Sequence, residues 1–268
     1  MTATEQERTG LEPAAYAAEV GGAVEESLRR ELAAVYRLIA HFKMTDLIYN
    51  HISVRLPGPE HRFLINPFGL LYEEITASSL VIVGLDGQLV TDGQWRVNPA
   101  GFVIHSAIHE AREDAHCVLH THTKAGCAVA AQEHGLLPLS QMSLEFYNRV
   151  AYHDYEGIAT SPDEKKRLVA DLGDKPVMIL RNHGLLSIGR TPGQAFLRML
   201  NLERSCEIQV DALAGGAKLV FPSLSVCEHT ARQFGGDSSD DYSLNGHSNL
   251  AWNAMLRLVE RLYPDYKD

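Results

Sequence analysis

The sequence Cys117-Val118-Leu119-His120-Thr121-His122-Thr123 is an apolar run that ends in a His-x-His. It predicts a buried strand over residues 116–122, and side chains in a strand return to the same face at every second residue. The side chains of His120 and His122 should therefore point the same way. Two neutral imidazoles, each about 2.0–2.1 Å from a shared centre, can bind a divalent metal that still needs a third protein ligand.

A second apolar run supplies a candidate for that third ligand. Val177-Met178-Ile179-Leu180-Arg181-Asn182-His183-Gly184 predicts a strand that stops on His183, and the glycine has no Cβ and leaves room beside the ring. Any one of these histidines could be a core residue satisfied by hydrogen bonds. The combination of the His-x-His with the His-Gly favours a metal site made by His120, His122 and His183.

The remaining pattern predicts alternating helices and strands. An amphipathic helix covers 16–42, with a possible break at Gly21-Gly22, and helices follow at 101–112, 125–132 and 250–262. Strands are expected at 50–56, 61–65, 80–83, 88–90, 136–139 and 150–155, with a hairpin across Asp86-Gly87. Ser161-Pro162 and Thr191-Pro192 each mark a helix start, and the second helix should run to about 214. Residues 222–246 read as a loop. This order is an α/β layered fold with mixed strand pairing.

The composition bounds the class of protein. The chain has 268 residues, and no linker divides it, so we expect a single domain over 1–268, with a core at about 28–216 and a C-terminal arm and helix at 217–268. A net charge of −10 without a basic stripe argues against nucleic-acid binding. The four cysteines show no disulfide spacing, and no stretch resembles a signal peptide or a membrane span, so the expected location is cytoplasmic.

Several of these segments together resemble the class II aldolase/adducin family, typified by the fuculose-phosphate and ribulose-phosphate enzymes. The segments are His51-Ile52-Ser53-Val54-Arg55, Ile65-Asn66-Pro67-Phe68-Gly69, the helix that leads to His105, and the two histidine runs described above. The resemblance implies a mixed, largely antiparallel nine-stranded sheet sandwiched by helices. It also implies a cyclic homotetramer with sites between subunits, and one divalent metal per subunit held by His120, His122 and His183.

The sequence departs from the sugar-phosphate aldolases at their phosphate-binding and catalytic positions. Their two phosphate-binding serines and catalytic glutamate correspond to Pro99, Ala100 and Gly101. Their phosphate-anchoring asparagine corresponds to His51, a Thr or Ser of the phosphate loop to Phe68, and the tyrosine lent by a neighbouring subunit to Gln141. The metal ligands are present and the phosphate cradle is not, so a phosphorylated sugar is not the expected substrate.

Other residues are candidates for binding and proton transfer. Glu145 and Tyr147 lie close in sequence to the missing tyrosine and are candidates for acid–base chemistry, together with Gln141. Arg181 could bind a carboxylate through two hydrogen bonds. Phe68 and Phe102 could line an apolar pocket, and His51 could contact the substrate. His105 is expected to support the site or to pack beside it, and His109 to be exposed.

Three functions from different classes fit these residues. The first is a metal-dependent lyase, an aldolase or decarboxylase that cleaves a C–C bond of a non-phosphorylated 2-oxo or 2-hydroxy acid, with Zn(II) or Mn(II) as Lewis acid. The second is a non-haem Fe(II) oxygenase that decarboxylates an aryl 2-oxo acid, as in the members of this fold that serve aminocoumarin antibiotic biosynthesis. The third is a scaffold without catalysis, like the adducin head domains. The complete histidine set disfavours the third, because a scaffold has no physical need for it.

Overall fold

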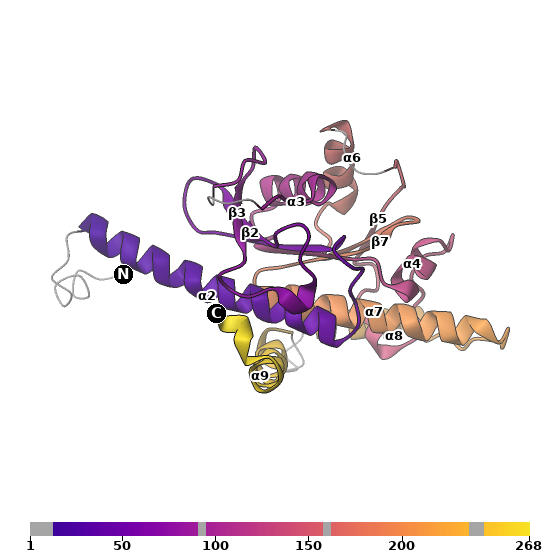
Figure 1. Cartoon of the computed structure of the whole chain (residues 1–268). Helices are drawn as coiled ribbons and strands as arrows, with labels where there is room; N and C mark the ends of the chain where they lie inside the picture. The colour runs from indigo at the N-terminus through magenta and orange to yellow at the C-terminus, as the bar shows by residue number, and fades with distance from the viewer. Residues whose placement is uncertain (1–12, 91–94, 158–161, 236–243) are drawn as a thin grey trace.

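A computed structural model describes residues 13–90, 95–157, 162–235 and 244–268. Its helices are α2 (Pro13–His41), η1 (Tyr72–Glu74), α3 (Pro99–Ala111), α4 (Lys124–Ala130), α5 (Gln141–Leu144), α6 (Pro162–Leu172), α7 (Pro192–Ala214), α8 (Leu224–Gly235), α9 (Leu244–Leu262) and η2 (Pro264–Lys267). Its strands are β1 (His51–Arg55), β2 (Arg62–Ile65), β3 (Val81–Gly84), β4 (Cys117–Thr121), β5 (Val150–His153), β6 (Val177–Leu180) and β7 (Gly184–Gly189). The predicted α/β class is confirmed (Figure 1).

The strands form one mixed sheet in the order β3-β2-β1-β4-β7-β6-β5. All neighbouring pairs are antiparallel except β5 and β6, which are parallel. The expectation of a largely antiparallel sheet is therefore confirmed, but the expected nine strands are wrong, because the described residues form seven.

Two predicted strands explain part of that difference. Residues 88–90 make only an isolated bridge, between Val83 and Leu89, instead of a strand. Residues 136–139 form no ladder: the amide of Leu137 donates to the side chain of Gln209, and Pro138 has no amide hydrogen to donate.

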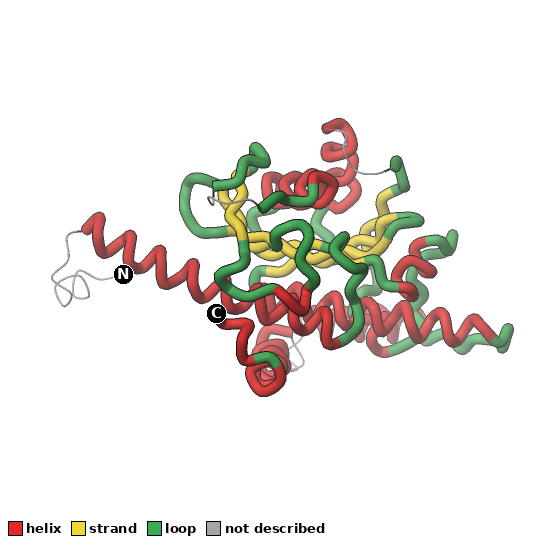
Figure 2. Tube along the Cα trace, in the orientation of Figure 1, coloured by secondary structure: helices red, strands yellow, loops and turns green. Residues whose placement is uncertain are grey.

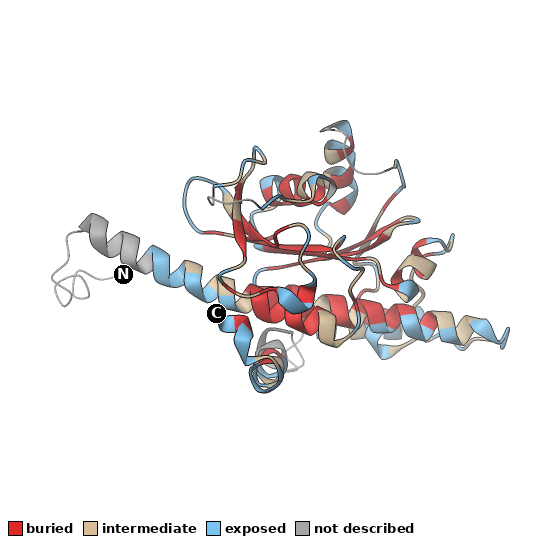
Figure 3. Cartoon of the chain, in the orientation of Figure 1, coloured by how far each residue is buried: buried red, intermediate tan, exposed pale blue. Residues whose placement is uncertain are grey.

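Helices cover both faces of the sheet (Figures 1 and 2). On one face, α3 and α6 pack over Val118, Met178 and Leu186, which alternate with residues of the other face. The opposite face carries Cys117, Leu119 and Ile179 and packs against α2, α4 and α7, and α9 packs in turn against α2 and α7. Figure 3 shows that the strands, the C-terminal part of α2 and the N-terminal part of α7 are largely buried. The central strands β4, β6 and β7 therefore have two buried faces, which agrees with their near-continuous apolar runs, whereas the edge strands β3 and β5 alternate buried and half-buried residues.

The helix predictions hold with two exceptions. Helix α2 continues through Gly21-Gly22 without a break, and α8 occupies part of 222–246, where we predicted a loop. Only Cys227 of α8 is buried, so the apolar periodicity that marks a packed helix is weak there. Thr191 caps α7 as predicted, accepting from the amide of Gln194 at 3.1 Å. The predicted cap Ser161 lies outside the described residues.

None of the helices within the described ranges combines the length and the apolar character that a membrane crossing requires.

The contact between Gly193 of α7 and Trp252 of α9 generates a stability prediction. A Cβ at Gly193 would lie 2.5 Å from Cδ2 of Trp252, a ring that is 9% exposed. We expect Gly193→Ala to reduce the free energy of unfolding by about 1–3 kcal/mol in chemical denaturation, because the overpacked ring must move. Gly215→Ala at the other end of α7 is the matched control. No heavy atom lies within 4 Å of its Cβ, so a change of no more than about 0.5 kcal/mol is expected.

Candidate metal centre

Three imidazole rings converge at one edge of the sheet. The Nε2 atoms of His120 and His122 are 2.7 Å apart, those of His122 and His183 are 2.9 Å apart, and those of His120 and His183 are 3.2 Å apart. His120 is buried, and the other two are half-buried. The sequence therefore identified three residues that the fold brings together.

The strand order explains this convergence. His120 lies in β4 and His122 follows directly after its end, on the same side of the sheet as Val118. His183 lies in the turn between β6 and β7, one residue before the neighbouring strand β7, so it does not end a strand as predicted. Gly184 opens β7 where a Cβ would lie 2.3 Å from the carbonyl oxygen of Thr121 and 3.2–3.3 Å from the rings of His122 and His120. The expectation that this glycine leaves room beside the imidazoles is confirmed.

Hydrogen bonds on the far side of two rings fix their protons. Nδ1 of His120 lies 2.8 Å from the carbonyl oxygen of Leu185, and Nδ1 of His122 lies 2.9 Å from Oδ2 of Asp46. Both partners accept only, so each Nδ1 carries a hydrogen and donates, and in the neutral ring each Nε2 carries a lone pair. Two lone pairs facing each other at 2.7 Å cannot form a hydrogen bond. The donor set therefore fits a shared divalent cation, with the carbonyl and the carboxylate orienting the ligands.

The environment also favours the neutral form that metal binding needs. Burial, together with the imidazoles of His183, His122 and His51, holds the pKa of His120 well below its usual value. Burial and the nearby His122 lower the pKa of His183 to about 4. Both rings are therefore neutral at pH 7.

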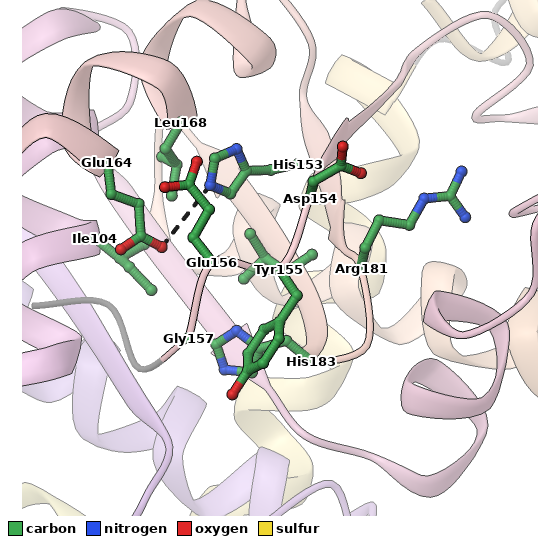
Figure 4. Close-up of a pocket in the computed structure, with 11 residues that line it drawn as sticks. Ile104, His153, Asp154, Tyr155, Glu156, Gly157, Glu164, Leu168, Arg181 and His183 are labelled. Carbon is green, nitrogen blue, oxygen red and sulfur yellow. Dashed lines mark ion pairs between the residues drawn. The ribbon is translucent and has the colours of Figure 1, made fainter. Parts of the chain in front are cut away.

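A cavity of about 340 Å³ opens in front of the three rings. Besides the three histidines, its lining includes Asp46, Tyr49, His51, Asn98, Ile104 and Tyr155. Figure 4 shows a smaller adjoining hollow, in which Tyr155 lies beside His183, with ring centroids 6.4 Å apart. The volume is at the small end of the range for ligand pockets, which suits a small organic molecule.

A chain of buried polar side chains leads away from this cavity between the sheet and α3. Nδ1 of His51 lies 2.7 Å from Nε2 of His105, and Nδ1 of His105 lies 2.6 Å from Oγ of Ser53. The same hydroxyl lies 2.7 Å from Nε2 of His109, and Nδ1 of His109 lies 2.9 Å from the carbonyl oxygen of Ala115. All four side chains are at most 4% exposed. The expectation that His109 is exposed is therefore wrong, because the buried face of α3 includes both histidines.

The sequence matches the family described as Class II Aldolase and Adducin N-terminal domain over residues 30–210. This chain belongs to that family. A provisionally named aldolase class 2 protein of Caulobacter vibrioides is 48% identical over 91% of this chain and 93% of its own length. Alpha-adducin of Rattus norvegicus is 52% identical over 71% of this chain, a match that spans 26% of the adducin.

Solved structures agree with this assignment. The crystal structure of an aldolase II superfamily protein from Pseudomonas syringae has a TM-score of 0.84 and 51% identity, and the match covers 91% of this chain and 96% of that one. L-fuculose 1-phosphate aldolase from Glaciozyma antarctica has a TM-score of 0.79 and 27% identity, with coverages of 92% and 94%. The resemblance noted in the sequence motifs is therefore confirmed at the level of family and fold.

The four predicted substrate-binding residues of this class II aldolase family member are placed differently from one another. His51 lines the cavity. Phe102 stacks on Phe63 at 6.0 Å in a small separate core, and Phe68 is half-buried in the turn after β2, so neither lines the cavity with the histidines. Arg181 donates to the carbonyl oxygens of Gln132 and Glu133 and covers Tyr152, and Figure 4 shows it directed away from His183.

The predicted catalytic residues lie elsewhere in the subunit. Gln141 is exposed and lines a groove with residues of α8, and Tyr147 lines a separate cavity with Phe146 and Val150. Glu145 is 2% exposed and accepts from Nδ2 of Asn201 at 2.9 Å, and burial raises its pKa to about 7. None of the three shares the cavity of the histidines within one subunit.

Sequence reasoning missed Asp46, Asn98 and Tyr155 at the site and Ser53 behind it. Asp46 and Asn98 lie outside the strands, where no periodicity directs a side chain. Ser53 was recoverable, because it lies two residues after His51 in the same strand and therefore on the same face.

The geometry predicts the behaviour of a ligand variant of this family member. His120→Ala should bind a divalent metal so weakly that none remains after gel filtration, since one of three protein ligands is lost. The variant should remain folded by circular dichroism. Metal content by inductively coupled plasma mass spectrometry is the measurement, and His134→Ala, which removes an exposed histidine, is the control. Full metal occupancy in His120→Ala would show that the ligand assignment is wrong.

The buried chain predicts a loss of stability in acid. Burial, with Arg55 nearby, lowers the pKa of His109 to about 3, against about 6.5 for an unfolded histidine. Between these values the unfolded state binds more protons, so stability is present above pH 6.5 and is lost as the pH falls. From pH 7 to pH 5, His109 alone should cost the folded state about 2 kcal/mol.

This effect is measured by urea denaturation of metal-free protein at the two pH values. Wild type should lose about 2 kcal/mol more than His109→Gln does, because glutamine does not titrate. His134→Gln should behave as wild type does. Parallel losses in wild type and His109→Gln would contradict the assignment of a neutral buried His109.

Proposed function

We propose that this protein is a metal-dependent lyase that cleaves a C–C bond of a non-phosphorylated 2-oxo or 2-hydroxy acid. The observation that carries the proposal is the convergence of three imidazole nitrogens at the wall of a cavity of about 340 Å³. A divalent cation held by His120, His122 and His183 would supply a Lewis acid for the negative charge that develops on oxygen as the bond breaks.

The residues around the three histidines support a small acid as substrate. Three protein ligands leave positions free for two oxygens of a chelating carboxylate and its neighbouring oxo or hydroxyl group. Asp46 holds the ring of His122, and Tyr49, Asn98 and Tyr155 provide polar groups with apolar surface around the bound molecule. The cavity's size limits the ligand to a small organic acid.

The charge of the lining supports the absence of a phosphate group. The residues that line the cavity include no lysine or arginine within the described part of the chain, and Asp46 is acidic. A phosphate dianion is normally held by cationic side chains or by several backbone amides at a helix start. Here the start of α3 carries Pro99, which lacks an amide hydrogen. A carboxylate needs fewer cationic side chains or backbone amides than a phosphate, because the cation itself can neutralise it.

Proton transfer needs an acid or a base at the cavity. Within one chain, the cavity is not lined by Gln141, Glu145 or Tyr147. We propose that these residues act at the site of a neighbouring subunit in a homotetramer, as the family resemblance implies. Gln141 is exposed and Tyr147 is half-buried, so both can reach an interface, whereas Glu145 is enclosed beside Asn201. Gln141 and Tyr147 are therefore the better candidates of the three.

The alternative of an Fe(II) oxygenase acting on an aryl 2-oxo acid rests on the same three ligands. Its additional support was an apolar pocket that included Phe68 and Phe102, and these rings do not line the cavity. The lyase is therefore our preferred function. Because alpha-adducin is a relative, the third possibility is a scaffold that binds no metal. That outcome would contradict both the lyase and the oxygenase.

The decisive experiment loads metal-free protein anaerobically with Zn(II), Mn(II) or Fe(II) and incubates it with a panel of 2-oxo and 2-hydroxy acids. A lyase should release cleavage products without oxygen, detected by mass spectrometry, and should lose at least about 99% of that activity in His122→Ala. Products formed only with Fe(II) and with oxygen uptake would support the oxygenase. Failure of the wild type to bind any of the three metals would support the scaffold and overturn the proposal.

A further inference from the structure

The chain of buried side chains behind the cavity has only one arrangement of hydrogens. It begins at the carbonyl oxygen of Ala115, which can only accept, so Nδ1 of His109 carries a hydrogen and donates. A neutral His109 then has a lone pair on Nε2, which accepts from the hydroxyl of Ser53. Since Ser53 has a single hydrogen, its oxygen must accept from Nδ1 of His105.

The same reasoning continues to the cavity. With its hydrogen on Nδ1, a neutral His105 has a lone pair on Nε2, which accepts from Nδ1 of His51 at 2.7 Å. A neutral His51 therefore has no hydrogen on Nε2. All three rings are at most 4% exposed, and burial disfavours a charged imidazole.

The remaining nitrogen of His51 is available to a ligand. The ring lines the cavity and lies beside His120, with centroids 5.2 Å apart. Fully buried side-chain nitrogen or oxygen atoms without a partner occur in Asn50, Arg55, Tyr72 and His153 of the described chain. Nε2 of His51 is not in this set, so it either has a partner or is accessible. No protein group in the described ranges donates to it, so the atom is open to the cavity.

We propose that His51 binds the substrate as an acceptor through Nε2, and that the site therefore selects a hydroxy acid over the corresponding oxo acid. This inference rests on the proposed function and narrows its substrate class. A hydroxyl group on the carbon next to the carboxylate can donate to Nε2 of His51 while its oxygen remains on the cation. An oxo group has no hydrogen to donate, and its oxygen would face the lone pair of His51.

Gly101 makes this position of His51 possible. A Cβ at residue 101 would lie 2.2 Å from Cδ2 and 2.5 Å from Nε2 of His51. The ring therefore occupies the space that a side chain at residue 101 would need. Gly101→Ala offers a variant that displaces the ring of His51 while leaving its chemistry unchanged, and alanine is favourable in a helix such as α3.

The first test measures binding by isothermal titration calorimetry to the Zn(II)-loaded full-length protein. The probes are two matched pairs, lactate with pyruvate and mandelate with phenylglyoxylate. The hydroxy acid of each pair should bind at least about tenfold more tightly, because a polar group left unpaired in a buried site costs that much or more. The ratio should fall toward one in His51→Asn, whose amide can donate as well as accept, and in Gly101→Ala.

Ser53→Ala and Ser106→Ala form a matched pair of variants for the chain itself. Ser53→Ala breaks the link between His105 and His109 and should reduce the ratio, since the hydrogen of His51 is no longer fixed. Ser106→Ala removes a buried hydroxyl from the residue after His105, where it bonds to the carbonyl oxygen of Val103, and should leave the ratio unchanged. Equal effects of the two variants would overturn the role of the chain.

The second test needs no measurement of activity, and its readout is taken on the wild-type protein. Nitrogen NMR of the protein labelled at histidine should show His51 with its hydrogen on Nδ1 and none on Nε2, the signal being assigned with His51→Asn. A hydrogen on Nε2, or equal binding of hydroxy and oxo acids to wild type, would overturn the inference.

Metal spectroscopy separates the two proposals. The Co(II) spectrum of the acid-free protein should be the same in wild type and His51→Asn, and a difference would make His51 a metal ligand and overturn its role as acceptor. If neither metal nor acid binds, the proposed function fails. If both bind without discrimination, only this inference fails.

Discussion

The antiparallel pairing of β1 with β4 is the constraint on which the site depends. Its register sets His51 opposite His120 and Ser53 opposite Val118, so side chains of both strands reach the same face of the sheet. A shift of one residue would turn every one of these side chains to the other face. The apolar residues that alternate with them, Ile52 and Leu119, are fully buried against the larger core, and their burial holds the register.

Placing so many imidazoles behind one sheet face has an energetic cost that the structure offsets with geometry. A buried polar group without a partner costs roughly 1–3 kcal/mol, and the chain from Ala115 to His51 partners each nitrogen but the last. The side chains of His109, Ser53 and His105 each use one donor and one acceptor position in sequence, and His51 uses its donor, so the order of donors and acceptors is fixed. Such a network specifies one packing of α3 on the sheet, because a rotated helix would leave several nitrogens unpartnered.

The sequence predicted the convergence of the three histidines because a strand has a strict period of two. His120 and His122 needed only that period, and His183 needed only the apolar run before it and the glycine after it. The same reasoning failed where the outcome depends on which element covers which face. We predicted His109 at the surface. It is buried because α3 lies on the sheet with both of its histidine side chains inward. We predicted Phe102 at the cavity, but its ring packs on Phe63 of strand β2.

Two departures from the sugar-phosphate aldolases, considered separately, read as losses: a glycine in place of the catalytic glutamate and a histidine in place of the asparagine. The structure places these two positions in direct contact. The ring of His51 fills the volume beside Gly101, and a side chain at residue 101 would overlap it. A glutamate at residue 101 and a histidine at residue 51 therefore exclude each other by volume. With glycine at residue 101 and an imidazole at residue 51, neither position would bring a carboxylate to a cation held by the three histidines. An anionic acid can then approach the cation without repulsion from that position, which is why the glycine and the histidine point to the same class of ligand.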